Sequence, residues 1–252
     1  MILERFRLDG CIAVVTGGSK GIGEGVTLAL AEAGADVAVV SRRPNPALED
    51  AVRRMGRRFH HHMADLTDRD QTKRVVSETV NALGDLHILV NNAGVCLRAA
   101  AADFSESDWD ATLEIDLTAA FILSQAAGRW MLRKKRGKII NIGSVLSFQG
   151  GINVAAYTAA KHGVAGLTKA LSNEWAKAGI NVNAIAPGYI ATELTYALQN
   201  DPVRSKSILS RIPAGRWGSS EDIAGAAVFL ASPASDYING TVLSVDGGWL
   251  AW

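Results

Sequence analysis

The sequence predicts an α/β fold in which one doubly wound sheet of seven parallel strands forms a single domain over residues 1–252. Short runs rich in Val and Ile alternate with helical patterns, and these runs are apolar throughout rather than at every second residue. Strands of this kind are covered by helices on both faces, which is the arrangement of a parallel sheet. No internal repeat, low-complexity segment or linker divides the chain.

The expected strands, in chain order, are 11–16, 36–41, 57–65, 86–94, 137–144, 180–188 and 241–248. Helical patterns lie between them, including 23–35, which ends at a glycine in the manner of a helix C-cap, 105–133 and 155–178. The segment of about 188–220 is polar, with weak helical periodicity and no strand. Because it follows the sixth strand at the carboxyl edge of the sheet, we expect a substrate lid there. The alternative is a surface segment that only packs.

Composition restricts the classes of function that the chain can have. It carries 26 basic and 25 acidic residues, so no overall field favours nucleic acid. No apolar stretch approaches the length of a membrane span, and the N-terminus lacks the apolar core of a signal peptide. Two cysteines fit a reduced, cytoplasmic protein. The triplet His60–His62 is interpreted as part of a strand, whose residues alternate between faces, and a metal site is the less favoured alternative.

A glycine loop, "TGGSKGIG" at 16–23, follows the first strand and opens a helix. Glycines let the backbone turn tightly and approach a pyrophosphate, and the helix N-terminus supplies amide donors. The glycines fall at 17, 21 and 23, a wider spacing than the ordinary dinucleotide fingerprint. The position of the loop between strand and helix therefore predicts a dinucleotide site.

The stretch "YTAAK" places Tyr157 and Lys161 four residues apart in a predicted helix, so that both side chains address one point. A free tyrosine has a pKa of about 10, too high for proton transfer near neutrality. A nearby ammonium favours the phenolate, and we expect it to lower the pKa of Tyr157, assisted by an oxidised nicotinamide. The pair is a candidate for acid–base catalysis.

These motifs together resemble the short-chain dehydrogenase/reductase family over essentially the whole chain. They are the glycine loop, "NNAG" at 91–94, Ser144, the Tyr157–Lys161 pair and "PG" at 187–188, in that order. The resemblance implies a Rossmann-type domain in which Tyr157 exchanges a proton with the substrate oxygen and Ser144 polarises it. Lys161 would tune Tyr157 and hold the nicotinamide ribose. Asp116 stands where the family commonly has asparagine; we expect it to accept hydrogen bonds and support Lys161.

The cofactor is expected to be NADP(H). The second strand ends in "VVSRRPN", which offers two arginines and no carboxylate for a ribose diol. Guanidinium groups bind a 2′-phosphate, whereas a carboxylate would repel it. The alternative is that these arginines are solvated turn residues. The cofactor-binding residues implied by the motifs and the resemblance are Gly17, Ser19, Lys20, Gly21, Ile22, Gly23, Ser41, Arg42, Arg43, Asp65, Leu66, Asn91, Asn92, Ala93, Gly94, Tyr157, Lys161, Pro187, Gly188, Ile190 and Thr192.

Within the family, "SFQGGINVAAYTAAKHG", "RIPAGRWG" and "VDGGWLA" resemble the sugar-acid branch. The implied reaction interconverts a secondary alcohol and a ketone on a sugar acid such as a gluconate, a deoxygluconate or its keto form. The alternatives are a 3-oxoacyl thioester or general ketone reductase, and a non-catalytic NADP-binding regulatory protein. The substrate-side candidates are Cys96, Arg98, Ser144, Gln149, Asn153 and Tyr189, with Arg98 as a partner for a substrate carboxylate and packing as the alternative for Cys96 and Tyr189.

The resemblance also implies a homotetramer built partly from the helices 105–133 and 155–178. Trp249 and Trp252 stand at the end of the chain, where exposed large aromatics would be unusual. We expect them to be buried against another subunit; the alternative is that they fold back onto their own.

Overall fold

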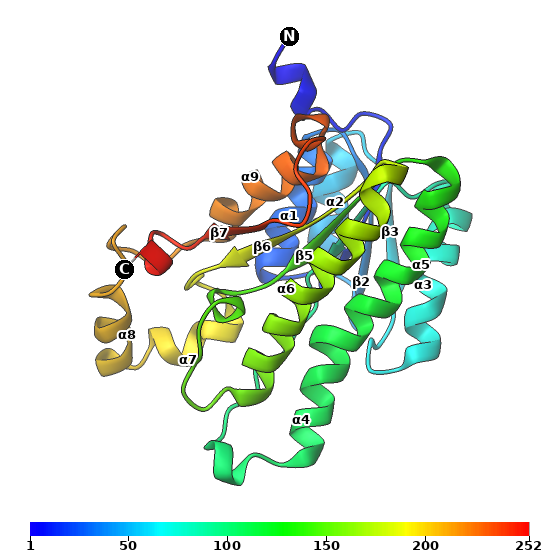
Figure 1. Cartoon of the computed structure of the whole chain (residues 1–252). Coiled ribbons are helices and arrows are strands. Elements are labelled where there is room, and N and C mark those ends of the chain that lie inside the picture. Colours follow the sequence, from blue (N-terminus) through cyan, green and yellow to red (C-terminus); the bar gives the residue numbers. More distant parts are fainter. Residues whose placement is uncertain (252) are drawn as a thin grey trace.

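The computed structural model describes residues 1–251, and its single sheet has the strand order β3-β2-β1-β4-β5-β6-β7 (Figure 1). All neighbouring strands run parallel. The predicted doubly wound α/β domain is therefore confirmed. The strands are β1 Ile12–Thr16, β2 Asp36–Ser41, β3 Phe59–Met63, β4 Ile88–Asn91, β5 Gly137–Ile142, β6 Ile180–Pro187 and β7 Val242–Val245. The expected strands 57–65, 86–94 and 241–248 were too long, because their ends already belong to loops.

Helices cover both faces of the sheet, as the apolar strands require. Alternate residues of β1 enter two separate cores: Ala13 and Val15 pack with α1, α2 and α9, whereas Ile12 and Val14 pack with α3, α5 and α6. Both faces of β1 are thus out of water, which is why its sequence shows no polar alternation. The helices are α1 Gly21–Glu32, α2 Pro46–Arg54, α3 Arg69–Leu83, α4 Glu106–Leu113, α5 Ala119–Lys134, α6 Ala155–Trp175, α7 Tyr196–Gln199, α8 Pro202–Leu209 and α9 Ser220–Ala231.

The expected helix 105–133 is not continuous. A π-helical turn, Glu114–Thr118, separates α4 from α5. A π turn inserts an extra residue and changes which side chains face inward, and such turns often occur at functional sites. Here it directs Asp116 into the interior, where that residue is 1% exposed.

The segment 188–220 lies beside the carboxyl end of β6 and contains a 3₁₀ turn, Glu193–Thr195, followed by α7 and α8 (Figure 1). A single β-bridge between Ile190 and Gly218 closes its base. The C-terminal 3₁₀ turn Trp249–Ala251 packs against it through Ile208 and Ile212. Within residues 1–251, no helix combines the length and apolar character needed to cross a membrane.

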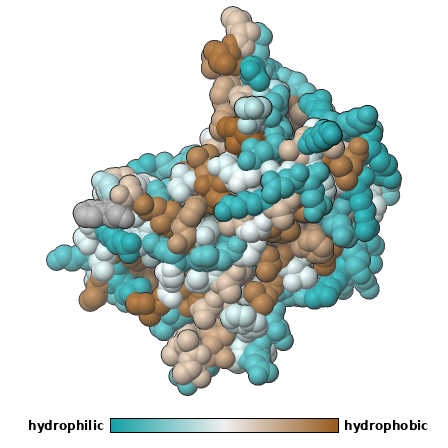
Figure 2. Space-filling model, viewed as in Figure 1, coloured by the Kyte–Doolittle hydropathy of each residue, from teal (hydrophilic) through white to brown (hydrophobic). Residues whose placement is uncertain are grey.

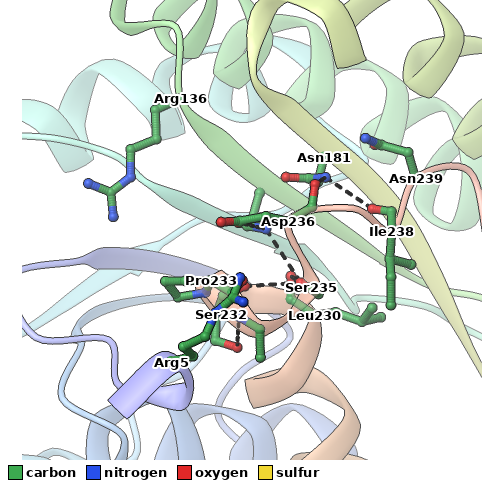
Figure 3. A network of polar contacts seen from close by, with 12 residues as sticks. Arg5, Arg136, Asn181, Leu230, Ser232, Pro233, Ser235, Asp236, Ile238 and Asn239 are labelled. Carbon is green, nitrogen blue, oxygen red and sulfur yellow. Dashed lines mark hydrogen bonds and ion pairs between the residues drawn. The ribbon is translucent and has the colours of Figure 1, made fainter. Parts of the chain in front are cut away.

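The opposite end of the sheet is held by a polar network (Figure 3). The Arg5 guanidinium donates to the Pro233 carbonyl at 2.7 Å, and Asn181 at the start of β6 donates to the carbonyls of Asp236 and Ile238. The network ties the N-terminal turn and the segment after α9 to the amino end of β6. A binding site is therefore expected at the other end of the sheet, among the loops at the carboxyl edge of the strands.

The three histidines of β3 alternate between faces. The rings of His60 and His62 pack edge to face with centroids 4.4 Å apart, whereas His61 Nε2 lies 2.9 Å from the Ser41 hydroxyl on the neighbouring strand. The interpretation of this triplet as strand is confirmed. His61 thus contacts the last residue of β2, which directly precedes Arg42 and Arg43.

Candidate active site

Ser144 follows β5 and caps a 3₁₀ turn, Val145–Ser147. Its Oγ accepts a hydrogen bond from the Leu146 amide at 3.1 Å, and its own amide donates to Ser147 Oγ. The hydroxyl of Ser147 in turn donates to the carbonyl of Lys161 at 2.9 Å, which ties this turn to α6. Because the Ser144 Oγ is oriented as an acceptor toward Leu146, its hydrogen is available to donate to a substrate oxygen.

Tyr157 and Lys161 lie in the first turns of α6, on one face of the helix. The Lys161 ammonium is 5.3 Å from the centre of the Tyr157 ring. Lys161 is only 4% exposed, and it donates a hydrogen bond to the Ile142 carbonyl at 3.1 Å and forms an ion pair with Asp116 at 3.2 Å. An ammonium has three donors, so one remains for a ligand.

Asp116 supports this arrangement from the π turn. Its Oδ2 forms the ion pair with Lys161, and its Oδ1 accepts the Val95 amide at 2.7 Å. The close approach depends on Gly94, because a Cβ there would lie 3.0 Å from Oδ2. The carboxylate thus joins the loop after β4 to the lysine of α6, as expected of a residue that supports Lys161.

The electrostatics of the three groups are coupled through burial. Burial raises the pKa of Asp116, and Lys161 opposes that shift. Burial lowers the pKa of Lys161, but the charges of Asp116 and Tyr157 outweigh it, and the net pKa is raised. Burial also raises the pKa of Tyr157; Lys161 lowers it and Asp116 raises it further. Lys161 thus acts on Tyr157 in the expected direction, but burial has the larger effect, so the pKa of Tyr157 in the protein alone is raised rather than lowered. The expected lowering with an oxidised nicotinamide beside Tyr157 stays a prediction.

The glycine loop forms a tight turn between β1 and α1. Gly17 and Gly21 have φ values of +61° and +55°, and a Cβ at Gly23 would lie 2.2 Å from the Gly17 carbonyl oxygen. Ser19 and Lys20 form the crest of the loop, and Ile22 packs on the core below. The glycine loop (residues 16–23) and the N-terminus of α1 together form an open surface of backbone atoms, which we call the glycine cradle. Its shape and its amide donors fit a pyrophosphate.

The turn after β2 is fastened to the glycine loop. The Ser41 hydroxyl donates to the Arg43 carbonyl at 2.7 Å, and the Asn45 amide donates to the Ser19 carbonyl at 2.9 Å. Arg42 and Arg43 are exposed, and neither forms an ion pair with any residue of the described chain. Because the Ser41 hydrogen goes to Arg43, the contact with His61 requires His61 Nε2 to donate. The two guanidinium groups are free to meet a phosphate at this edge.

Two asparagines of "NNAG" bind the protein itself through their side chains. Asn91 is buried and donates to Ser124 and Asn141, and Asn92 donates to the carbonyls of Thr16 and Gly17. They hold the strands and the glycine loop in place, with Ala93 and Gly94 directly after them. The side-chain donors of Asn91 and Asn92 are thus used within the protein, and contact of these residues with a cofactor stays a prediction.

Comparison with known proteins decides the family. A model described as enoyl-(acyl carrier protein) reductase matches residues 17–250. The 2-dehydro-3-deoxy-D-gluconate 5-dehydrogenase of Escherichia coli (strain K12) is 51% identical over 253 residues that cover 100% of both chains. This chain belongs to the short-chain dehydrogenase/reductase family.

Two solved members of the family have the same fold. The gluconate 5-dehydrogenase of Burkholderia cenocepacia J2315, in complex with NADP and tartrate, is 41% identical with a TM-score of 0.96, and the match covers 100% of both chains. A protein of Agrobacterium tumefaciens with bound NADP is 52% identical with a TM-score of 0.93, over 98% of this chain and 99% of that one.

The remaining cofactor candidates of this short-chain dehydrogenase/reductase lie along the carboxyl edge. The Asp65 carboxylate accepts the amide and hydroxyl of Thr67, and Leu66 is buried in the core with α3. Thr192 caps the 3₁₀ turn of the 188–220 segment, and its methyl group faces Gly21. Pro187 ends β6, a Cβ at Gly188 would meet the Asp246 backbone at 2.7 Å, and Ile190 is buried in the core. Lys20 of the glycine loop forms an ion pair with Glu193 of the 188–220 segment at 2.5 Å. This pairing partly neutralises the positive charge that Lys20 was expected to offer to a cofactor phosphate.

The substrate-side candidates come from three loops. The Ala99 amide donates to the carbonyl of Asn153, which brings the loop of Cys96 and Arg98 beside the loop of Gln149. Asn153 has a φ of +63°, and burial raises the pKa of the Cys96 thiol. Tyr189 packs edge to face on Trp217 and Trp249, so the packing alternative describes it well.

Trp249 was wrongly expected at a subunit interface. It is 5% exposed within its own subunit, where Val145, Ile208 and Ile212 surround it. The C-terminal turn packs on its own subunit because apolar side chains of the 188–220 segment cover the Trp249 indole. The expectation for Trp252 lies outside the described residues. Two contacts near the site were not expected from the sequence, those of His61 with Ser41 and of Arg211 with Trp249, because each joins segments distant in the chain.

Proposed function

We propose that the protein is an NADP(H)-dependent oxidoreductase that interconverts a secondary alcohol and a ketone on a sugar acid such as a deoxygluconate or its keto form. One observation carries the proposal: the Ser144 hydroxyl, Tyr157 and the buried Lys161–Asp116 pair lie at the carboxyl edge of the same sheet as the glycine cradle. Relatives over the whole chain named as gluconate and deoxygluconate dehydrogenases support the substrate class.

Tyr157, Ser144 and Lys161 each have a separate role in the proposed proton transfer. In reduction, Tyr157 donates its phenolic proton to the carbonyl oxygen, and in oxidation it accepts the alcohol proton. Ser144 donates a hydrogen bond to the same oxygen and stabilises the charge that develops on it. Lys161, held as an ammonium by Asp116, favours the phenolate and has one N–H left for the nicotinamide ribose. The bound cofactor supplies or accepts the hydride.

The preference for NADP(H) rests on Arg42 and Arg43, neither of which forms an ion pair with a carboxylate among residues 1–251. Hydrogen bonds from Thr67 lower the pKa of the Asp65 carboxyl, and the charge of Arg42 helps to lower it. We expect NADPH to bind at least about tenfold more tightly than NADH, equivalent to about 1.4 kcal/mol. Replacing both arginines by Ala should remove the difference, whereas Arg54→Ala, an exposed arginine at the end of α2, should keep it. Titration of both cofactors by fluorescence tests this, and equal affinities for the wild-type protein would contradict it.

The segment 188–220 is proposed to close over the substrate. Its Thr192 already lies against the glycine loop, and its Glu193 is paired with Lys20 across the cofactor cradle. Closure of such a segment would exclude water from the reacting groups. The two free cysteines, Cys11 and Cys96, support a reducing, cytoplasmic location.

A homotetramer remains part of the proposal. Trp109 of α4 and Phe121 of α5 are 38% and 43% exposed, and Figure 2 shows hydrophobic residues among polar ones on the face that α5 and α6 form in Figure 1. Exposed aromatics on such helices support assembly through this face. Sedimentation of the intact chain measures it, and a monomer would refute it.

A panel of carbonyl substrates tests the reaction itself. Keto sugar acids, 3-oxoacyl thioesters and simple ketones are each mixed with the protein and NADPH, and loss of NADPH absorbance is followed. We expect turnover with a keto sugar acid to exceed that with the other classes. Greater turnover of thioesters would identify the reductase alternative instead, and no turnover of any substrate by a folded, NADPH-binding protein would favour a regulatory role.

A further inference from the structure

Arg211 follows α8 in the 188–220 segment and lies over the indole of Trp249. Its guanidinium carbon is 4.0 Å from the ring centre. Trp249 itself is fixed among Val145, Ile208 and Ile212. A guanidinium stacked by its face on an aromatic ring keeps its N–H edges free, so the platform orients the group without using its donors.

The donors of Arg211 are not satisfied by the protein. The one hydrogen bond of its side chain within residues 1–251 goes to Gln149 Oε1 at 3.5 Å, the outer limit for such a bond. The side chain of Arg216, in the same segment, is by comparison well bonded: two of its nitrogens donate hydrogen bonds to the Asp222 carboxylate at 2.6 and 2.7 Å. Arg211 is thus an oriented, exposed cation whose weak contact a carboxylate can replace.

The position of Arg211 is on the substrate side. Val145, which contacts the Trp249 platform, is the residue after Ser144, and Gln149 lies on the same loop. Beneath the guanidinium, the Trp249 indole nitrogen is buried and has no hydrogen-bond partner in the described chain. An unsatisfied buried donor is costly, and it is more readily understood in a binding site than in a packing core.

We propose that Arg211, stacked on Trp249 and assisted by the amide of Gln149, binds the carboxylate of the substrate. The inference rests on the proposed function, because it requires a sugar acid. It competes with the expectation that Arg98 fills this role: Arg98 is exposed, and neither a hydrogen bond nor an ion pair holds its side chain among residues 1–251, whereas Arg211 is oriented by Trp249. A bidentate guanidinium–carboxylate pair selects acids over neutral sugars of the same shape.

The test compares a keto sugar acid with its uncharged amide as substrates for the wild-type protein, Arg211→Met, Arg211→Lys, Arg98→Met and a control, Arg204→Met. Arg204 is an exposed arginine of α8 in the same segment. Because the lost contact is a charge-assisted hydrogen bond, the ratio of kcat/KM for acid over amide should fall at least about tenfold in Arg211→Met. The loss should appear in KM, and Arg211→Lys should recover part of the ratio.

Three outcomes would overturn the inference: an equal loss for acid and amide, a wild-type protein without preference for the acid, or a loss that appears in Arg98→Met instead. Failure of the proposed function looks different, because the wild-type protein would then reduce neither the acid nor its amide while reducing other carbonyls. NADPH affinity, measured by fluorescence, should stay within about twofold in every variant, since the side-chain contacts of Arg211 are with Trp249 and Gln149 and not with the glycine loop.

Discussion

Replacing Lys161 by Met should destabilise the protein strongly, because it leaves Asp116 buried without its counter-charge. Asp116 is 1% exposed and Lys161 4% exposed, and their charges are 3.2 Å apart. Removal of one partner from such a pair costs about 3–5 kcal/mol. In a domain of this size, each 1 kcal/mol lowers the melting temperature by about 2–4 °C. We therefore expect Lys161→Met to melt about 10 °C below the wild type.

The loss should depend on pH with a defined sign. Burial raises the pKa of Asp116 in the folded protein, and removal of Lys161 takes away the charge that opposed this shift. A carboxyl group with a raised pKa binds its proton more tightly when folded than when unfolded, so the folded state loses stability as pH rises through the folded pKa. The deficit of Lys161→Met should be largest near neutral pH and should shrink as the solution is acidified.

The matched control is the double variant Asp116→Asn/Lys161→Met. The amide removes the buried charge while its oxygen can still accept the Val95 amide. Thermal melting followed by circular dichroism, at one protein concentration, compares the four proteins of the cycle. The reasoning fails if Lys161→Met melts with the wild type, or if Asp116→Asn restores none of the loss.

Three further results follow from the site. Gly23→Ala should weaken NADPH binding at least about tenfold, because its Cβ would meet the Gly17 carbonyl at 2.2 Å; fluorescence titration measures this, and unchanged affinity would contradict the cradle. Asp116→Asn should move the pH profile of alcohol oxidation to lower pH, because it removes a charge that raises the pKa of Tyr157; a shift to higher pH would contradict the assigned coupling. His61→Phe should reduce the preference for NADPH over NADH, whereas His60→Phe should retain it, since only His61 contacts Ser41; equal preferences in the two variants would remove His61 from the phosphate site.

The sequence predicted the features that depend on residues close together in the chain, such as single strands and the faces of single helices. The apolar run of β1 reports a strand covered on both faces, and the spacing of Tyr157 and Lys161 reports one helix face. The π turn at Glu114–Thr118 could not be predicted, because the helical pattern continues through it and nothing local marks the inserted residue. Its consequence, the burial of Asp116 beside Lys161, depends on contacts between separate helices.

The same limit applies to the substrate side. Trp249 and Arg211 are 38 positions apart, and only the packing of the C-terminal turn on the 188–220 segment places one over the other. A terminal tryptophan alone favoured an interface between subunits, since large aromatics avoid water. The seat formed by Ile208 and Ile212 satisfies that requirement within one chain.

The account depends most on Tyr157 as the proton donor, and the variant Tyr157→Phe tests it most directly. Phenylalanine keeps the ring near Lys161 and removes only the hydroxyl. Turnover of the best keto sugar acid and NADPH affinity are measured on the same preparation. We predict a loss of kcat of about 10²–10⁴-fold, the usual contribution of a positioned acid or base, with NADPH affinity near that of the wild type. Turnover close to wild type in Tyr157→Phe would contradict the assigned chemistry.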